Sequence, residues 1–154
     1  MSPRAACRLE TLGFTHVYDY VPGKIDWLAH DLPSHGTAAD TPTIGAHVRR
    51  EVVTCRPDES LGEVRARVAA SAHRFALVTN TGGILLGRLR AHALDHTDPD
   101  SPAADLMEPG PSTLRPHEPA TEIRAHLADN DLSYAIVTDP DGVLLGTVHP
   151  DDLA

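Results

Sequence analysis

The sequence lacks the features that mark several large classes of protein. No apolar run approaches the roughly 20 residues that a bilayer-spanning helix requires, and the segment after Met1 has no apolar signal-peptide core. Only two cysteines occur, Cys7 and Cys55, and they form no Cys-x-x-Cys pair. The sequence therefore predicts a cytoplasmic protein whose two cysteines are reduced and serve packing.

Signatures of metal binding and of common catalytic chemistry are also missing. The ten histidines are scattered and form no His-Glu-x-x-His string, and no paired-cysteine signature occurs. There is no Gly-x-x-x-x-Gly-Lys phosphate loop and no Gly-x-Ser-x-Gly elbow. We therefore predict no metal site, no catalytic residue and no enzymatic activity.

The charge balance argues against polyanionic partners. The 154 residues carry a formal net charge of −9, so the surface field is expected to repel nucleic-acid backbones and anionic headgroups. Hydrophobic residues make up 41% and charged residues 23%, which is typical of a folded globular chain. The length suits one ordinary domain or two small repeats that share a core.

The most informative feature is an internal repeat with an offset of 59 residues. The best-matched stretches are 54–59 with 113–118, 63–66 with 122–125, 75–79 with 134–138 and 83–87 with 142–146. About 16 of 45 aligned positions are identical, and most of the others exchange similar residues. This pattern indicates a duplicated structural unit.

Each copy predicts the same order of elements. A short extended segment, 52–55 or 112–114, ends before a proline, and a helix follows in which Ser60 is the expected N-cap with Glu63 at capping-box spacing. A near-continuous apolar strand comes next and is expected to be central and buried on both faces. Glycine-containing turns then predict a hairpin into a second apolar strand, and a short helical turn closes each copy. The fold class is therefore α/β (α+β), with βαββα in each copy.

This order resembles a CBS-domain pair, or Bateman module, in which two βαββα units pack sheet to sheet about a pseudo-twofold axis. The resemblance covers about 110 of the 154 residues and implies a first CBS repeat at 43–104 and a second at 105–154. In this family AMP, ADP, ATP or S-adenosylmethionine binds as a regulatory ligand between the units. The resemblance also implies a homodimer, and it implies no cofactor other than such a ligand.

The resemblance also implies which residues hold the ligand. In the family, an Asp just after the last strand binds the ribose hydroxyls, and in the second copy Asp152 takes this position while His149 replaces the usual Thr or Ser. A carboxylate can accept hydrogen bonds from both vicinal hydroxyls of a ribose. Family geometry adds candidates from the opposite copy: Thr54, His73, Arg74 and Phe75. Plain structural roles also stay open, namely a solvated carboxylate for Asp152 and core packing for Phe75.

The first copy departs from the family pattern. Ala93 stands at the ribose position, and Arg90 stands where the hydroxyl residue is expected. The cleft of the first copy is therefore expected to have lost ordinary ribose recognition.

Residues 1–33 predict a separate helix-strand-helix segment, with the strand over 16–20. The helix, the Gly13 stop and Trp27 resemble the last third of a rhodanese-like sulfurtransferase domain. In that family the reactive cysteine precedes the helix, so Cys7, which lies within it, does not match the nucleophile. So short a segment cannot fold alone, and it must dock on the repeats, pair with another chain or stay loosely held. Residues 34–42 predict a linker.

Three functions follow from these patterns. The main prediction is a regulatory module that senses an adenosine-containing ligand in the cleft between the repeats. The alternative is a structural, dimerising CBS pair without ligand, which the loss of Asp at Ala93 favours. The third, a sulfurtransferase, lacks its nucleophile loop.

Overall fold

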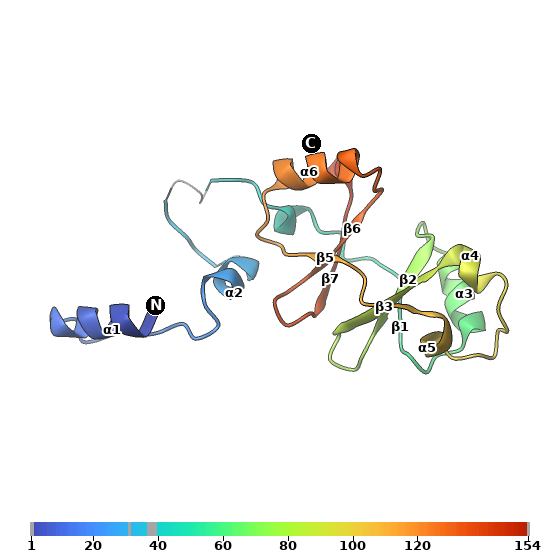
Figure 1. The fold of residues 1–154 in the computed structure, drawn as a ribbon, viewed down its shortest axis with the longest axis horizontal. Coiled ribbons are helices and arrows are strands. Elements are labelled where there is room, and N and C mark those ends of the chain that lie inside the picture. Colours follow the sequence, from blue (N-terminus) through green and yellow to red (C-terminus); the bar gives the residue numbers. More distant parts are fainter. Residues whose placement is uncertain (1, 31, 37–39, 154) are drawn as a thin grey trace.

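The computed structural model describes residues 2–30, 32–36 and 40–153. Two small sheets lie side by side, and a narrower N-terminal segment extends away from them (Figure 1). Four parts of the predicted organisation lie outside the described residues: Met1 and Asp31 of the first segment, residues 37–39 of the linker and Ala154 of the second repeat. No helix in the described ranges is long and apolar enough to cross a bilayer.

The predicted βαββα order occurs twice, which confirms the fold class. The first repeat consists of β1 (Thr54–Cys55), α3 (Leu61–Ala69), β2 (Phe75–Thr79), β3 (Leu85–Arg90) and α4 (Ala91–Leu94). The second consists of β5 (Thr113–Leu114), α6 (Ala120–Asp129), β6 (Ala135–Thr138), β7 (Leu144–Val148) and the 3-10 helix η2 (Pro150–Leu153). In each sheet the central strand pairs parallel with the first strand and antiparallel with its hairpin partner.

Local sequence signals explain these elements. The Ser60 hydroxyl accepts a hydrogen bond from the Glu63 N–H at 3.4 Å, so Ser60 is the N-cap of α3, as predicted. The hairpins turn at Gly83 and Gly142, whose φ angles of 78° and 84° are in the left-handed region that glycine adopts without strain. Asn80 Oδ1 accepts from two backbone N–H groups in the first turn, and Asp139 Oδ1 does the same in the second.

The central strand β2 is buried on both faces, as its apolar sequence predicts. Ala76 and Val78 pack in a core with α3, whereas Phe75 and Leu77 pack against Ile136 of the other repeat. Helix α6 covers the outer side of one sheet, and α3 with α4 covers the outer side of the other (Figure 1). The two sheets therefore face each other across a shared interior.

Backbone contacts also join the two hairpins. Ile84 pairs with Val143 across the seam, and the Leu85 N–H donates to Gly142 O at 3.0 Å. The Leu144 N–H donates to Gly83 O at 3.0 Å, which is the same contact with the repeats exchanged. The two copies therefore pack about a pseudo-twofold axis, as predicted.

The chain preceding each repeat crosses to the opposite repeat, a feature that the sequence did not predict. The first crossing segment, residues 43–49, contains the 3-10 helix η1 (Ile44–His47) and buries Ile44 in the core of the second repeat. The Ile44 N–H donates to Glu118 O at 3.0 Å, and Thr43 pairs with Pro119. The chain that leads into the first repeat therefore packs in the core of the second repeat.

The second crossing segment, residues 102–109, makes the equivalent contacts on the first repeat. It contains α5 (Ala103–Leu106) and β4 (Glu108–Pro109), and β4 extends the first sheet next to β3. The Ala103 N–H donates to Glu59 O at 2.8 Å, which keeps the offset of 59 from the contact of Ile44. The predicted boundary between residues 104 and 105 therefore falls inside α5, because the packing units exchange these segments.

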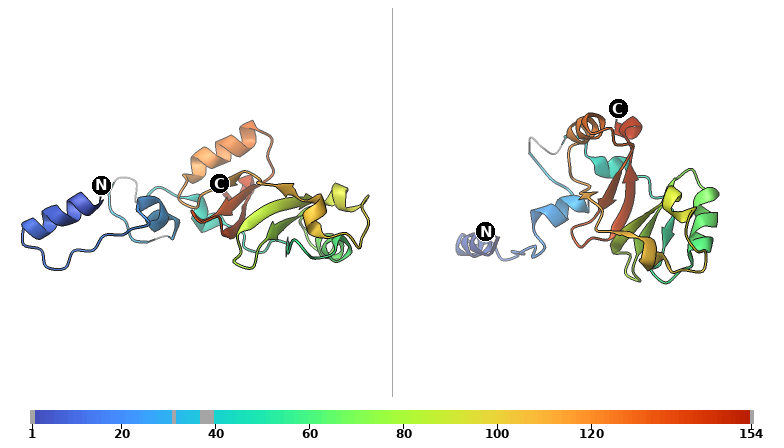
Figure 2. Two further views of the ribbon diagram at one scale, coloured as in Figure 1. Left: turned by 60° about the horizontal axis from the view of Figure 1, so that its bottom comes forward. Right: turned by 45° about the vertical axis from the view of Figure 1, so that its right-hand side comes forward.

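The N-terminal segment contains α1 (Ser2–Thr11) and α2 (Lys24–Ala29), with α1 standing apart from the sheets (Figure 2). The strand predicted over 16–20 is wrong, since these residues form no strand and Tyr18 is 87% exposed. An isolated extended stretch has no neighbouring strand with which to pair. A local contact forms instead, in which the Tyr20 hydroxyl donates to Asp26 at 2.5 Å and packs edge-on against Trp27.

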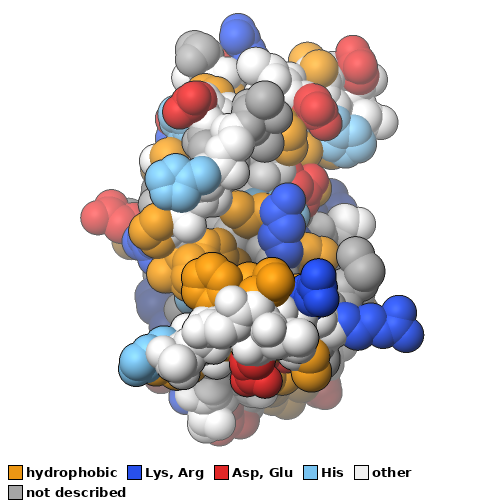
Figure 3. All heavy atoms as spheres, turned by 90° about the vertical axis from the view of Figure 1, so that its left-hand side faces the viewer, with side chains coloured by type: hydrophobic (Ala, Val, Ile, Leu, Met, Phe, Trp, Pro, Cys, Tyr) orange, Lys and Arg blue, Asp and Glu red, His pale blue; other side chains and the backbone are white. Residues whose placement is uncertain are grey.

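Of the N-terminal segment, helix α2 lies next to the second repeat. Leu28, Ala29 and His30 line a cavity of about 380 Å³ together with residues of the first crossing segment and with Pro116 and Leu145. Helix α1, by contrast, leaves Leu9 and the neighbouring Leu12 and Phe14 exposed. Figure 3 views this end of the molecule and shows hydrophobic side chains at its surface.

Candidate functional site

An aromatic pair marks the seam between the repeats. The rings of Phe75 and Tyr134 stack with centroids 4.2 Å apart and an interplanar angle of 11°. The two residues occupy equivalent positions, 59 apart, so the pair lies at the pseudo-twofold axis. Phe75 is 6% exposed, whereas Tyr134 is half-buried. Each repeat contributes a set of polar side chains around this pair, and the two sets differ.

The second-repeat site comprises Asp152, His149, His73 and Arg49. Asp152 follows β7 in η2, and both of its carboxylate oxygens accept from Arg49, with Nε and Nη2 each at 2.7 Å. Arg49 ends the first crossing segment, whose backbone pairs with Thr147 of β7. The hydrogen bond from Arg49 holds the pKa of Asp152 below its usual value, so this carboxylate is ionised at neutral pH.

His149 lies between this ion pair and the aromatic pair. Its ring centroid is 6.2 Å from that of Tyr134, and its Nε2 is 3.4 Å from the Thr147 hydroxyl. Burial lowers the pKa of His149, and the positive charge of Arg49 lowers it further. The imidazole is therefore neutral near pH 7, and it offers a phosphate a hydrogen bond but no full positive charge.

The structure brings four of the six predicted site residues into one neighbourhood. Asp152 adjoins His149, His149 adjoins Tyr134, and the Tyr134 ring stacks on Phe75. The His73 ring lies 5.5 Å from Phe75, and His73 Nε2 is 2.6 Å from the carbonyl oxygen of Glu51. These contacts link the carboxylate of the second repeat to β2 of the first.

The two other predicted residues line different cavities. Thr54 borders a cavity of about 330 Å³ near the β2–β3 hairpin, together with Glu59 and Arg67. Arg74 borders a cavity of about 380 Å³ on the first-repeat side of the aromatic pair. Among the contacts of the described residues, neither Thr54 nor Arg74 is bonded to Asp152.

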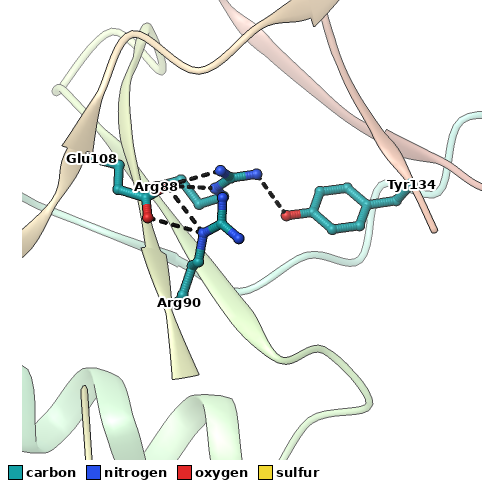
Figure 4. A network of polar contacts seen from close by, with 4 residues as sticks. All are labelled: Arg88, Arg90, Glu108 and Tyr134. Atoms are coloured by element: carbon teal, nitrogen blue, oxygen red, sulfur yellow. Dashed lines mark hydrogen bonds and ion pairs between the residues drawn. The ribbon is translucent and has the colours of Figure 1, made fainter. Parts of the chain in front are cut away.

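The first-repeat site comprises Arg74, Arg88, Arg90, His92 and Glu108. Figure 4 shows its centre, where Glu108 of the second crossing segment accepts from two arginines of β3. Arg88 Nη2 donates to Glu108 at 2.8 Å, and Arg90 Nε lies 2.9 Å from the same carboxylate. Arg88 also donates to the Tyr134 hydroxyl at 3.2 Å, which ties the site to the second repeat. These bonds, that from Arg88 first, hold the pKa of Glu108 below its usual value.

Several residues of these sites escaped the sequence prediction, and Tyr134 and Arg49 did so for different reasons. Tyr134 aligns with Phe75 in the repeat, so the alignment carried a signal for it. Arg49 aligns with Glu108, a residue of opposite charge, inside crossing segments that share no identical residue. The alignment therefore gave no signal for Arg49.

No metal site emerges from the described part of the chain. His92 and His96 stand four residues apart, a spacing that suits metal ligation on a helix. However, no group of three or more His, Cys, Asp or Glu side chains that could hold an ion occurs among the described residues. The one buried cysteine, Cys55, has its pKa raised to about 11 by burial, which makes it a packing residue rather than a nucleophile.

Comparison with known proteins supports the fold. Residues 103–154 match the CBS domain family. The CBS domains of a transcriptional regulator from Streptococcus pneumoniae superpose with a TM-score of 0.65 at 14% identity, covering 74% of this chain and 98% of that one. The fold is that of a CBS-domain pair.

Two further structures similar to this CBS pair were crystallised with nucleotides. The cytosolic domain of the Mg2+ channel MgtE in complex with ATP has 25% identity and a TM-score of 0.65, with 75% of this chain and 50% of that chain covered. CBSX2 in complex with AMP has 18% identity and a TM-score of 0.62, with 72% and 92% covered. The chain thus spans about half the length of the MgtE domain.

No curated protein sequence matches the chain. None of the comparisons supports the rhodanese-like interpretation of residues 1–33, and the strand that it requires at 16–20 does not form.

Proposed function

We propose that this CBS pair is a regulatory module, and not an enzyme, that binds an adenosine-containing ligand of the AMP, ATP or S-adenosylmethionine type at the second-repeat site. The observation that carries the proposal is the ionised carboxylate of Asp152, held beside the aromatic pair at the seam. Ligands of this class are bound by similar folds, namely ATP by the MgtE domain and AMP by CBSX2.

The proposed contacts follow from the chemistry of each group. Asp152 accepts hydrogen bonds from the two ribose hydroxyls. The adenine contacts the edges of the aromatic pair and of His73, which together offer an apolar, partly buried surface. His149 donates one hydrogen bond toward the phosphate. Thr54 and Arg74, predicted earlier as ligand contacts, lie toward other cavities and are not required.

Arg49 competes with the proposed ligand for the carboxylate of Asp152. Its bidentate bond occupies the two oxygens of Asp152 that the ribose would need. Ribose binding therefore requires the guanidinium to swing away, after which it is free to pair with a phosphate. Because Arg49 belongs to the first crossing segment, ligand binding would loosen the contact of that segment with the second repeat. That segment also borders α2, which provides a route from the ligand to the N-terminal segment.

The same ion pair favours a second candidate, a structural CBS pair without ligand. Arg49 already satisfies the carboxylate of Asp152, so the seam needs no ligand to be complete. In that case the module serves assembly, and the predicted homodimer becomes its main role. Sedimentation at several protein concentrations would test the dimer independently of any ligand.

Calorimetry with AMP, ATP and S-adenosylmethionine on the full chain separates the two candidates. We expect at least one of them to bind, and Asp152→Asn to weaken that binding at least tenfold, because the amide accepts with only one oxygen. Asp151→Asn is the matched control, since Asp151 is exposed and adjacent, and it should bind as the unaltered chain does. If none of the three ligands binds, the structural candidate is favoured. If Asp152→Asn binds a ligand as tightly as the unaltered chain does, the proposed site is wrong.

A further inference from the structure

The first-repeat site contains a cavity with a different chemical lining. The cavity measures about 380 Å³ and is bordered by Arg74, Arg90, His92, Asp95 and the aromatic pair. The position equivalent to Asp152 is Ala93, which has no side-chain acceptor for a ribose hydroxyl. The cavity therefore offers donors where the second-repeat site offers an acceptor.

The fold places the donors of two neighbouring strands at the same end of the sheet. Arg90 is the cross-strand partner of Phe75, and the carbonyl of Arg74 accepts from the Ala91 N–H at 2.9 Å. The Arg74 side chain is exposed, and its guanidinium makes no hydrogen bond or ion pair with other described residues. Arg90 is half-exposed and shares Glu108 with Arg88. One guanidinium is thus free, and a second is only partly satisfied.

This concentration of arginines stands out in a chain whose net charge is −9. Three arginines and one histidine meet two carboxylates, Glu108 and Asp95, within the site. Guanidinium forks bind phosphoryl oxygens with two parallel hydrogen bonds, and two forks suit an anion with more than one charged oxygen. A cavity of about 380 Å³ has room for an anion of two phosphoryl groups.

We infer that the first-repeat site binds a phosphoryl anion without engaging a ribose. Arg74 and Arg90 bind the anion, His92 lies at the cavity wall, and the aromatic pair closes the inner side. Glu108 competes with the anion for Arg90. The inference concerns a different site and a different ligand class from the proposed function, and it holds whether or not a nucleotide binds at Asp152.

The probe is inorganic pyrophosphate, titrated into the full chain by calorimetry at low ionic strength, because exposed ion pairs are screened by salt. We expect binding by the unaltered chain and at least tenfold weaker binding by Arg74→Ala, since a charge-assisted bidentate contact is lost. Arg74 is exposed, so this variant is expected to fold, and thermal unfolding followed by circular dichroism checks that it does. Arg124→Ala removes an exposed arginine of α6, distant from the site in sequence, and should bind as the unaltered chain does.

A second variant tests the competition by Glu108. Glu108→Gln removes the negative charge that holds Arg88 and Arg90, so pyrophosphate binding should strengthen by about threefold or more. Loss of the fold could only weaken pyrophosphate binding. An increase in affinity therefore shows that Glu108 competes with the anion for the arginines. Unchanged or weaker binding by a folded Glu108→Gln chain contradicts the assignment of Arg90.

Three further titrations test which chemical group is bound and at which site. Malonate, a dicarboxylate of similar size, should bind at least tenfold more weakly, and equal binding would overturn the phosphoryl assignment. Asp152→Asn should bind pyrophosphate undiminished, because it alters only the second-repeat site. Displacement of pyrophosphate by phosphate-free adenosine would place both ligands in one cleft and overturn the inference. No binding of pyrophosphate by the unaltered chain would overturn it outright.

Discussion

The two sites at the seam use the same backbone frame with opposite charges. In the second-repeat site an arginine of the crossing segment, Arg49, binds a carboxylate of the repeat, Asp152. In the first-repeat site the crossing segment contributes the carboxylate Glu108, and the repeat contributes Arg88 and Arg90. Arg49 and Glu108 occupy equivalent positions in the duplication. The difference shows that the two copies share the backbone contacts of their crossing segments. The side chains at the seam differ between the copies and carry opposite charges.

The largest expected effect concerns the glycines that let the crossing segments approach. A Cβ at Gly146 would overlap the Arg49 carbonyl oxygen, and its φ of 145° already disfavours other residues. We expect Gly146→Ala to lower the free energy of unfolding by about 3 kcal/mol. At the equivalent Gly87 a Cβ would lie 2.9 Å from the Glu108 carbonyl oxygen without an unfavourable φ, so Gly87→Ala should cost about 1–2 kcal/mol. Urea unfolding of both variants measures the two losses, and equal losses would contradict this difference.

The next effect is a gain of ligand affinity on removal of Arg49. If Arg49 competes with the ribose for Asp152, Arg49→Ala should bind adenosine about tenfold more tightly, which corresponds to about 1.4 kcal/mol. The gain should be smaller for AMP, because the variant also loses a cation that could pair with the phosphate. Stability should change little, since the ion pair is partly solvated. Calorimetry with both ligands measures the effect, and weaker adenosine binding would show that Arg49 is a ligand contact instead of a competitor.

A smaller effect concerns the hydroxyl that links the first-repeat site to the second repeat. Tyr134→Phe keeps the stacked ring but removes the acceptor of the Arg88 bond at 3.2 Å. We expect a loss of about 1 kcal/mol in the free energy of unfolding. Tyr18→Phe is the matched control, because Tyr18 is 87% exposed and should show no loss. Chemical denaturation compares the two, and an equal effect in both variants would mean that the Arg88 bond contributes nothing.

The smallest effect is a dependence of stability on pH near His149. Burial lowers the pKa of His149 in the folded protein, whereas in the unfolded chain it protonates near the ordinary value of about 6.5. Between these two pKa values the unfolded state binds more protons, so stability falls as the pH decreases below about 6.5. His149→Gln should therefore lose less stability than the unaltered chain between pH 7 and pH 5.5. Thermal melts at both pH values test this, and an identical loss in both proteins would contradict it.

The elements of each repeat could be predicted from sequence because their signals are local. Ser60 and Glu63 mark the start of α3, and the glycine turns at Gly83 and Gly142 fix the hairpins within a few residues. The crossing segments could not be predicted, because their partners lie in the other repeat. Residues 43–49 share no identical residue with their counterparts, so the alignment carried no sign that they belong to the repeat.

The candidate site was predicted only where the repeat or the resemblance marked it. Asp152 and His149 stand in the second copy's version of the family pattern, and the structure sets them beside the seam. The partner of Asp152 is 103 residues away in sequence, in a segment without helical or strand periodicity. The strand predicted over 16–20 failed because this segment has no neighbouring strand with which to pair among the described residues.

A single competition titration tests most directly whether the seam holds two sites of different chemistry. Adenosine is titrated into the full chain in the absence of pyrophosphate and again in its saturating presence. The account predicts that adenosine binds with the same affinity in both titrations, because each ligand occupies its own side of the aromatic pair. Loss of adenosine binding in the presence of pyrophosphate, or no binding of either ligand, would contradict it.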